Sequence, residues 1–246
     1  MSSCWWCLLP VLLWCATGHA GEVTVAVASN FAAPMQRLAV LFEAETGHKA
    51  ALALGSTGKF YAQIQNGAPF DVLLAADDDT PARLAQEGRG SQRFTYAIGK
   101  LVLWSRLPQA VDARGAVLST QTPQRLALAN PKLAPYGAAA MEVLQAMGVL
   151  ARWRDHLVQG ENIGQAYQFV ATGNAPLGFV ALSQVWEDGR LREGSAWMVP
   201  SHLYTPIRQD AILLRRGQDN PAALAWMAYL RSDKARALVR AYGYDL

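Results

Sequence analysis

From residue 21 onward the chain alternates short apolar runs with segments of helical periodicity. Val23–Ala28 is a run of Val and Ala broken only by one Thr, which is typical of a buried strand. Pro34–Glu45 follows it, with Met35, Leu38 and Phe42 at helical spacing. The pattern therefore predicts a strand and then a helix.

The same alternation continues to the C-terminus. Further strands are expected at Ala50–Leu54, Asp71–Ala76, Phe94–Trp104 (interrupted by Gly99), Leu126–Ala129, Leu177–Leu182 and Asp210–Arg215. Helices are expected at Lys59–Asn66, from Thr80 as N-cap and Pro81 as first helical residue to Gly88, at Ala138–Met147, at Gly164–Thr172 and over most of Pro221–Tyr242. Such alternation favours an α/β fold of βαβ units, with parallel sheets covered by helices on both faces.

The first twenty residues form a separate segment. They carry no Lys, Arg, Asp or Glu, and Trp5–Ala16 is an almost unbroken apolar run. The run ends in Gly18-His19-Ala20, a small-x-small pattern that suits signal peptidase. We therefore expect residues 1–20 to be a secretory signal peptide, cleaved after Ala20, of a periplasmic protein. Because its N-terminal region lacks Lys and Arg, an uncleaved anchor is the alternative.

All the cysteines lie in that segment. Cys4, Cys7 and Cys15 precede the expected cleavage point, so the mature chain contains no thiol. A catalytic cysteine, a thiolate metal site and a disulfide framework are thereby excluded. Trp14 stands where a lipobox needs a small residue, so Cys15 does not fit a lipidation site.

Composition narrows the class of protein. The 246 residues are 52% hydrophobic and 17% charged, as in a globular chain. The net charge of +3 is small and Lys and Arg are not clustered, which argues against binding to nucleic acid or to a membrane surface.

The common enzyme motifs are incomplete. Residues 53–59 look like a phosphate loop, but Ala53 stands where Gly is required and Phe60 where the Mg²⁺-binding hydroxyl is required. His48, His156 and His202 lack metal-ligand spacing. The acidic run 77–79 is expected in a solvated turn, with cation binding as the alternative.

Small polar residues stand at the starts of several predicted helices. They are Ser29-Asn30, Ser56-Thr57-Gly58, Tyr136-Gly137 and Asn162-Ile163-Gly164. Helix N-termini offer unpaired N–H groups and a positive dipole end, so together they could bind an anion without Arg or Lys. Each one taken alone is more simply an N-cap.

Several short motifs follow one another along the chain: Thr24–Asn30 (TVAVASN), Gly55–Gly58 (GSTG), Gln63–Val72 (QIQNGAPFDV), Ala75–Asp77, Asn130-Pro131 with Pro135–Gly137, Asn174–Val180 (NAPLGFV) and Ala241–Tyr244. In their order and spacing, the chain resembles a known family, the periplasmic molybdate-binding ModA proteins of ABC importers. The resemblance runs from Val23 to the C-terminus.

The resemblance implies a two-lobed type II periplasmic-binding-protein fold, in which each lobe is a mainly parallel sheet flanked by helices and the ligand lies in the cleft. The chain would cross between lobes near Tyr96–Gly99 and Tyr204–Gln209. Lobe 1 would then comprise residues 21–97 and 208–246, and lobe 2 residues 98–207. It also implies a monomer without enzymatic activity or cofactor, which delivers its ligand to an inner-membrane ABC permease.

The resemblance places the oxyanion ligands at Ser29, Asn30, Thr57, Tyr136 and Ile163, with Ser56 as a possible addition. Many members have a Tyr where this chain has Ala181, whereas others have it at the position of Tyr136. We therefore expect Tyr136 to supply a phenol donor and Ala181 to lie outside the site.

These positions contain no carboxylate, so the site suits a fully deprotonated tetrahedral dianion. Molybdate or tungstate fits that description, with Mo or W held only as the oxyanion. Phosphate near neutral pH carries a proton that needs an acceptor, and sulfate would have to be rejected by its smaller size. The alternatives are another tetrahedral oxyanion such as sulfate on the same fold or, with no base beside the hydroxyls, an enzyme using the cleft.

Overall fold

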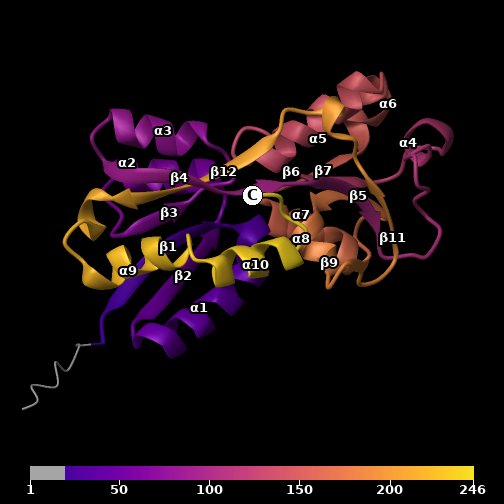
Figure 1. Cartoon of the computed structure of the whole chain (residues 1–246). Coiled ribbons are helices and arrows are strands. Elements are labelled where there is room, and N and C mark those ends of the chain that lie inside the picture. Colours follow the sequence, from indigo (N-terminus) through magenta and orange to yellow (C-terminus); the bar gives the residue numbers. More distant parts are fainter. Residues whose placement is uncertain (1–19) are drawn as a thin grey trace, which may run out of the picture.

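The computed structural model describes residues 20–246, and they form two sheets side by side, each flanked by helices (Figure 1). The predicted signal peptide lies outside the described residues, apart from Ala20. The expected two-part α/β fold is confirmed.

The first sheet has the strand order β2-β1-β3-β12-β4. Its strands are β2 (Lys49–Gly55), β1 (Glu22–Ala28), β3 (Val72–Leu74), β12 (Ile207–Leu214) and β4 (Gly90–Gly99). The helices α1 (Ala32–Thr46), α2 (Thr57–Gln65), α3 (Asp79–Gln86), α9 (Pro221–Tyr229) and α10 (Asp233–Ala241) lie on its side of the molecule (Figure 1). A short 3-10 turn, η1 (Ser29–Phe31), joins β1 to α1.

The second sheet has the order β11-β5-β8-β6-β7. Its strands are β11 (Ser195–Met198), β5 (Leu101–Ser105), β8 (Leu177–Ala181), β6 (Leu126–Ala129) and β7 (Leu157–Gly160). Its helices are α4 (Val117–Thr120), α5 (Pro135–Ala146), α6 (Leu150–Trp153), α7 (Ile163–Ala171) and α8 (Leu182–Val185), and a small hairpin pairs β9 (Trp186–Glu187) with β10 (Arg190–Leu191).

The sheets are mixed: each combines parallel with antiparallel pairs of strands, beside the expectation of mainly parallel sheets. β1 pairs in parallel with β2 and β3, but β12 runs antiparallel to both β3 and β4. In the second sheet β6 is parallel to β7 and β8, while β5 is antiparallel to β8 and β11. The antiparallel strands are those next to the points where the chain passes between the sheets.

One predicted helix start was wrong. Thr80 does not cap its helix: α3 begins at Asp79, and the Asp77 carboxylate accepts the Thr80 N–H at 2.9 Å. The segment Pro221–Tyr242 is mostly helical, as predicted, and it forms two helices, because Ser232 caps a new helix by accepting the Ala235 N–H. Short elements without a strong apolar pattern, such as β7, β11, α4 and α6, were missed.

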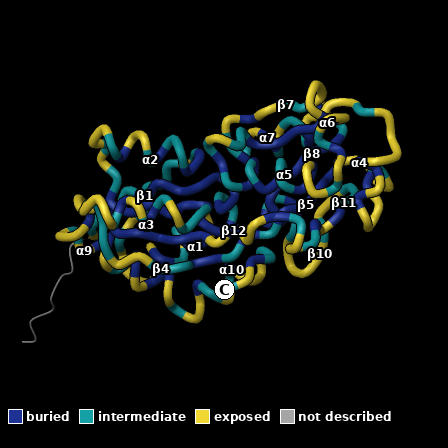
Figure 2. The backbone as a smooth tube through the Cα atoms, turned by 90° about the horizontal axis from the view of Figure 1, so that it is seen from above, coloured by how far each residue is buried: buried dark blue, intermediate teal, exposed yellow. Residues whose placement is uncertain are grey.

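Each sheet has its own core. The first is built around Phe31, Met35, Phe42 and Trp226, all fully buried. The second contains Trp153, Phe179 and the inward faces of β5 and β6. In Figure 2 the buried strands form a continuous dark centre in each half, under a shell of exposed helices and loops.

The chain passes twice between the sheets. It leaves β4 at Gly99 and enters β5 at Leu101, and it returns between β11 and β12. The C-terminus lies at the same place, since Asp245 pairs with Ile98 through two backbone hydrogen bonds. No helix in residues 20–246 has the length and apolarity to span a membrane.

Candidate functional site

A small cavity lies between the two sheets, at the end of β1 and β2. It is lined by Ala28, Ser29, Asn30, Gly55, Ser56, Thr57, Ala76, Ala134, Pro135, Tyr136, Asn162 and Ile163. All six residues singled out in the sequence are therefore brought together, and Ala181 is not among the lining residues. The volume open to the centre of a water-sized sphere is about 10 Å³, against about 350 Å³ for a neighbouring pocket, so the cavity suits only a compact ligand of few atoms.

Three helices begin at this cavity. Thr57 opens α2, Tyr136 is the second residue of α5 behind Pro135, and Ile163 opens α7. First-turn N–H groups have no acceptor inside their own helix. Within residues 20–246, the backbone N–H groups of Thr57, Tyr136 and Ile163 have no acceptor outside it either. The cavity therefore has backbone donors from both sheets.

The second loop adds two buried hydroxyl groups. Thr57 Oγ1 accepts the Ala76 N–H at 2.9 Å, so its own hydrogen remains for another acceptor. Ser56 is 2% exposed, and its Oγ has no hydrogen-bond partner in the part of the chain that the structure describes. A buried hydroxyl without a partner costs free energy, so Ser56 is a strong donor candidate for a ligand.

The side chains of the first loop, which were expected to be free donors, are already hydrogen-bonded within the protein. Ser29 Oγ donates to the Gly55 carbonyl at 2.8 Å. Both amide hydrogens of Asn30 are used, one on Gln209 Oε1 at 2.8 Å and one on Tyr244 Oη at 3.0 Å. Asn30 thus connects the cavity wall to a buried polar network, and the side-chain role predicted for it stays a prediction.

The Tyr136 phenol also belongs to this network. Its Oη accepts from Gln209 Nε2 at 3.1 Å and lies against Gly99, where a Cβ would be only 2.1 Å away. Burial raises the pKa of Tyr136 well above its ordinary value, so the phenol is neutral. A contact between the Tyr136 phenol and an anion therefore stays a prediction. The backbone N–H of Tyr136 is a separate candidate donor.

The third helix is capped as the sequence suggested. Asn162 Oδ1 accepts the Gln165 N–H at 3.0 Å, and Gln184 Nε2 donates to the Ile163 carbonyl at 3.1 Å. These bonds fix the first turn of α7 and leave the Ile163 N–H at the cavity. A Cβ on Gly164 would lie 3.3 Å from the Ser29 Cβ, which shows how closely α7 approaches the first loop.

No Asp, Glu, Lys or Arg lines the cavity among the described residues. Its polar groups are backbone N–H groups, hydroxyls and amides. A site of this kind favours an anion through helix dipoles and hydrogen bonds, and it offers no carboxylate to a ligand that carries a proton.

The acidic run lies beside the cavity rather than in it. Asp77, Asp78 and Asp79 line the larger pocket, together with Glu142 and Arg208. Asp77 is half-buried, which corrects the expectation of a wholly solvated turn, and burial raises its pKa to about 6. In the described residues no group of His, Cys, Asp and Glu is placed to hold a metal ion.

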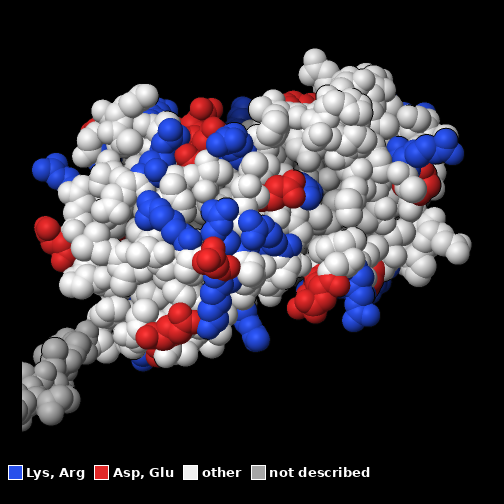
Figure 3. All heavy atoms as spheres, in the orientation of Figure 1, with Lys and Arg blue, Asp and Glu red and all other residues white. Residues whose placement is uncertain are grey.

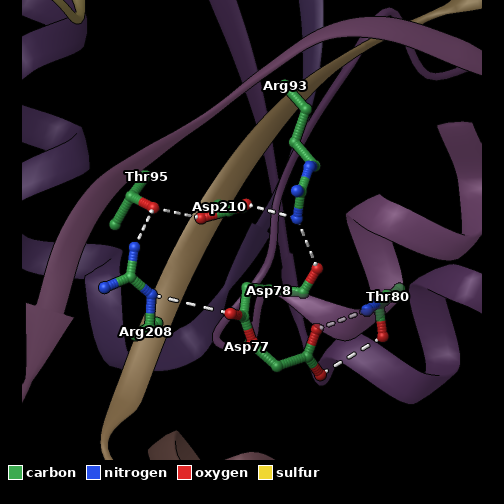
Figure 4. A network of polar contacts seen from close by, with 7 residues as sticks. All are labelled: Asp77, Asp78, Thr80, Arg93, Thr95, Arg208 and Asp210. Carbon is green, nitrogen blue, oxygen red and sulfur yellow. Dashed lines mark hydrogen bonds and ion pairs between the residues drawn. The ribbon is translucent and has the colours of Figure 1, made fainter.

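Figure 4 shows how this acidic turn is tied to the first sheet. Asp210 on β12 accepts from Arg93 at 2.9 Å and from Thr95 at 2.7 Å. Arg208 donates to Thr95 at 3.0 Å and lies 3.6 Å from Asp78. The network is structural, because its acidic and basic groups are paired with one another.

Sequence reasoning missed four buried polar residues next to the cavity. They are Tyr96, Ser183, Gln209 and Tyr244, and they hydrogen-bond Asn30 or one another. Gln209 had a weak signal, since a Gln beside an apolar strand must find partners if it is buried. Tyr244 ends the Ala241–Tyr244 motif, but nothing in the sequence indicated that it, Tyr96 or Ser183 would lie beside the cavity.

Two contacts close the cleft directly. Lys59 on α2 forms an ion pair of 2.7 Å with Glu161, just before α7. The Gly58 N–H donates to the Leu133 carbonyl at 3.0 Å.

On the face shown in Figure 3, Lys and Arg are interspersed with Asp and Glu, and no region of a single charge dominates.

The chain is similar to known solute-binding proteins in both sequence and structure. A family model described as bacterial extracellular solute-binding protein matches residues 23–245. The molybdate-binding protein ModA of Azotobacter vinelandii is 58% identical over 96% of this chain and 94% of its own length. ModA of Rhodobacter capsulatus is 50% identical over 92% and 88%. A solved periplasmic molybdate-binding protein of A. vinelandii superposes with a TM-score of 0.88, at 40% identity, over 92% of this chain and 99% of that one.

Proposed function

This chain belongs to the bacterial extracellular solute-binding proteins, and from that premise we propose that it is a periplasmic receptor that binds molybdate in the cavity between its two sheets. Its relatives named ModA support the ligand. Tungstate has the same charge and nearly the same size, so we propose that it binds as well.

The carboxylate-free cavity at the N-termini of α2, α5 and α7 is the observation that carries this proposal. A tetrahedral dianion has four oxygens that accept hydrogen bonds from several directions. The backbone N–H groups of Thr57, Tyr136 and Ile163, with the hydroxyls of Ser56 and Thr57, are such donors. Hydrogen bonds to a charged group contribute about 1.5–3 kcal/mol each. After the costs of ordering and desolvation are subtracted, five or more such hydrogen bonds support sub-micromolar affinity, a binding free energy below about −8 kcal/mol.

Ser29 and Asn30 complete the proposed site. Their first-turn backbone donors lie at the end of β1, and the Ser29 hydroxyl can turn from the Gly55 carbonyl to a ligand oxygen. The Asn30 amide holds the loop in place through Gln209 and Tyr244.

We propose that binding and closure are coupled. The donors come from lobe 1 (residues 21–97 and 208–246) and from lobe 2 (residues 98–207), so one anion satisfies both sets only when the lobes are together. The anion then shifts the population toward the closed form. The Lys59–Glu161 ion pair and the Gly58–Leu133 hydrogen bond stabilise that form.

We also propose a role for the protein in transport. The signal peptide directs the chain to the periplasm, and the closed monomer delivers its anion to an inner-membrane ABC permease. No chemical step on the ligand is needed, and no general base lies beside the cavity hydroxyls among the residues that line it.

Calorimetric titration of the dialysed mature protein at neutral pH tests the ligand. We expect one-to-one, sub-micromolar binding of molybdate and tungstate, with sulfate and phosphate at least about a hundredfold weaker, a difference of about 2.7 kcal/mol. Equal affinity for sulfate would contradict selection by size and favour a general oxyanion receptor. Absence of binding by every oxyanion would contradict the assigned ligand.

A further inference from the structure

Gln209 is a fully buried amide at the start of β12, where the chain returns to the first sheet. Both ends of the amide are hydrogen-bonded. Its Oε1 accepts from Asn30 Nδ2 at 2.8 Å and from Tyr96 Oη at 3.0 Å, and its Nε2 donates to Tyr136 Oη at 3.1 Å. A buried amide with partners at both ends is held in one orientation.

The partners of Gln209 belong to opposite walls of the cavity. Asn30 lies in the turn that follows β1 of the first sheet, whereas Tyr136 lies in the first turn of α5 beside the second sheet. Both residues line the cavity. One planar group of fixed length therefore connects the two walls.

The main chain at Gly99, where the chain first passes between the sheets, packs tightly against the Gln209–Tyr136 hydrogen bond. A Cβ on Gly99 would lie 2.1 Å from Tyr136 Oη and 2.5 Å from Gln209 Nε2. The hydrogen bond is thus packed directly against the main chain, and neither partner can slide toward Gly99.

We propose that Gln209 is a positioning residue that fixes the width of the cavity and thereby its selectivity among tetrahedral dianions of different size. This inference rests on the proposed function. Molybdate and sulfate share charge and shape and differ in size, so they are distinguished only if the donors of the two walls cannot close further onto the smaller anion. The Gln209 amide holds the walls apart by joining Asn30 to Tyr136.

A double-mutant cycle with Tyr136 tests the proposal. The proteins are the wild type, Gln209→Met, Tyr136→Phe and the double variant, each titrated with molybdate and with sulfate. Methionine keeps the length of the side chain and removes all three of its hydrogen bonds. We expect Gln209→Met to reduce the ratio of molybdate to sulfate affinity by about tenfold. In the Tyr136→Phe background the same change should reduce it little further, because the link is already broken.

The control separates positioning from stability. Asn220 is an amide on the far side of the first sheet, where it caps α9 and contacts Asp71. Asn220→Ala should lower the thermal unfolding temperature and leave the affinity ratio unchanged. If Gln209→Met behaves in that way too, Gln209 only stabilises the fold and the proposal is wrong.

A second variant covers the case in which Gln209→Met does not fold. Gln209→Asn keeps an uncharged amide but is one methylene shorter, so it cannot reach Asn30 and Tyr136 together, and the ratio should fall here as well. Tight molybdate binding by the wild type with an unchanged ratio in both variants contradicts this inference alone. Failure of the wild type to bind molybdate contradicts the proposed function and this inference together.

Discussion

The Lys59 ammonium lies 2.7 Å from the Glu161 carboxylate, and this ion pair joins α2 beside the first sheet to the loop before α7 beside the second. The same two helices present Thr57 and Ile163 to the cavity. The pair therefore acts on the distance between two groups of proposed ligand donors.

Replacing Glu161 by Gln should weaken molybdate binding modestly. The side chains of Lys59 and Glu161 are 42% and 64% exposed, and exposed pairs contribute about 0–1 kcal/mol. We expect an affinity loss of up to about fivefold at low salt, shrinking as salt screens the pair. Calorimetry at two salt concentrations measures it.

Glu43→Gln is the matched control, since Glu43 pairs with Lys49 within the first half of the molecule. It should leave the affinity unchanged. An equal loss in both variants would show that general charge, and not closure, is responsible.

Replacing Ser56 by Ala should separate binding from stability. Its hydroxyl has no partner in residues 20–246, so its removal should leave the free energy of unfolding unchanged or slightly higher. Molybdate affinity should fall about tenfold to a hundredfold, the value of one hydrogen bond to a charged group. Denaturant unfolding without ligand and titration with ligand measure the two quantities.

Thr57→Val provides the contrast, because it leaves the buried Ala76 N–H without its acceptor. This variant should lose both affinity and stability, the latter by about 1–3 kcal/mol. Unchanged affinity in Ser56→Ala would remove Ser56 from the proposed site.

Replacing Gly99 by Ala should disturb the cavity from outside it. The added Cβ would lie 2.1 Å from Tyr136 Oη, so the buried Tyr136 side chain or the main chain at Gly99 must move. We expect lower thermal stability and a molybdate affinity reduced by at least about tenfold. Thermal unfolding and calorimetry measure the effect, and wild-type values in both would show that the crossing adapts.

Asp77 should make stability depend on pH. Burial raises its pKa to about 6 in the folded protein, from the usual 3.8, and hydrogen bonds from Thr80 oppose the shift. Between pH 4 and 6 the folded state therefore binds more protons at Asp77 than the unfolded state does. Its contribution to stability falls as pH rises through that window.

Asp77→Asn tests this, since an amide can accept the Thr80 N–H without ionising. The free energy of unfolding of the variant, minus that of the wild type, should be larger at pH 7.5 than at pH 4.5. Denaturant unfolding at the two pH values measures it. Asp155→Asn, at an exposed position in another part of the molecule, should show no such difference. A constant difference between Asp77→Asn and the wild type at both pH values would contradict the pKa.

The apolar periodicity predicted most of the long elements, because their burial is decided by residues close in sequence. It missed that β12 lies between β3 and β4, since that pairing joins distant segments. It also placed the candidate donors at helix starts, which the structure brings together at one cavity. The network of Gln209, Tyr96 and Tyr244 could not be predicted, because the hydrogen-bond partners of each residue lie far away in the sequence.

The position of β12 has a kinetic consequence for synthesis. Residues 207–214 separate residues 72–74 from residues 90–99 in the first sheet, so the N-terminal third cannot complete its sheet on the ribosome. Non-local pairings of this kind slow folding. The core of the first sheet therefore stays unfinished until nearly the whole chain has been made, which fits the proposed export, since a secretion channel threads an unfolded chain.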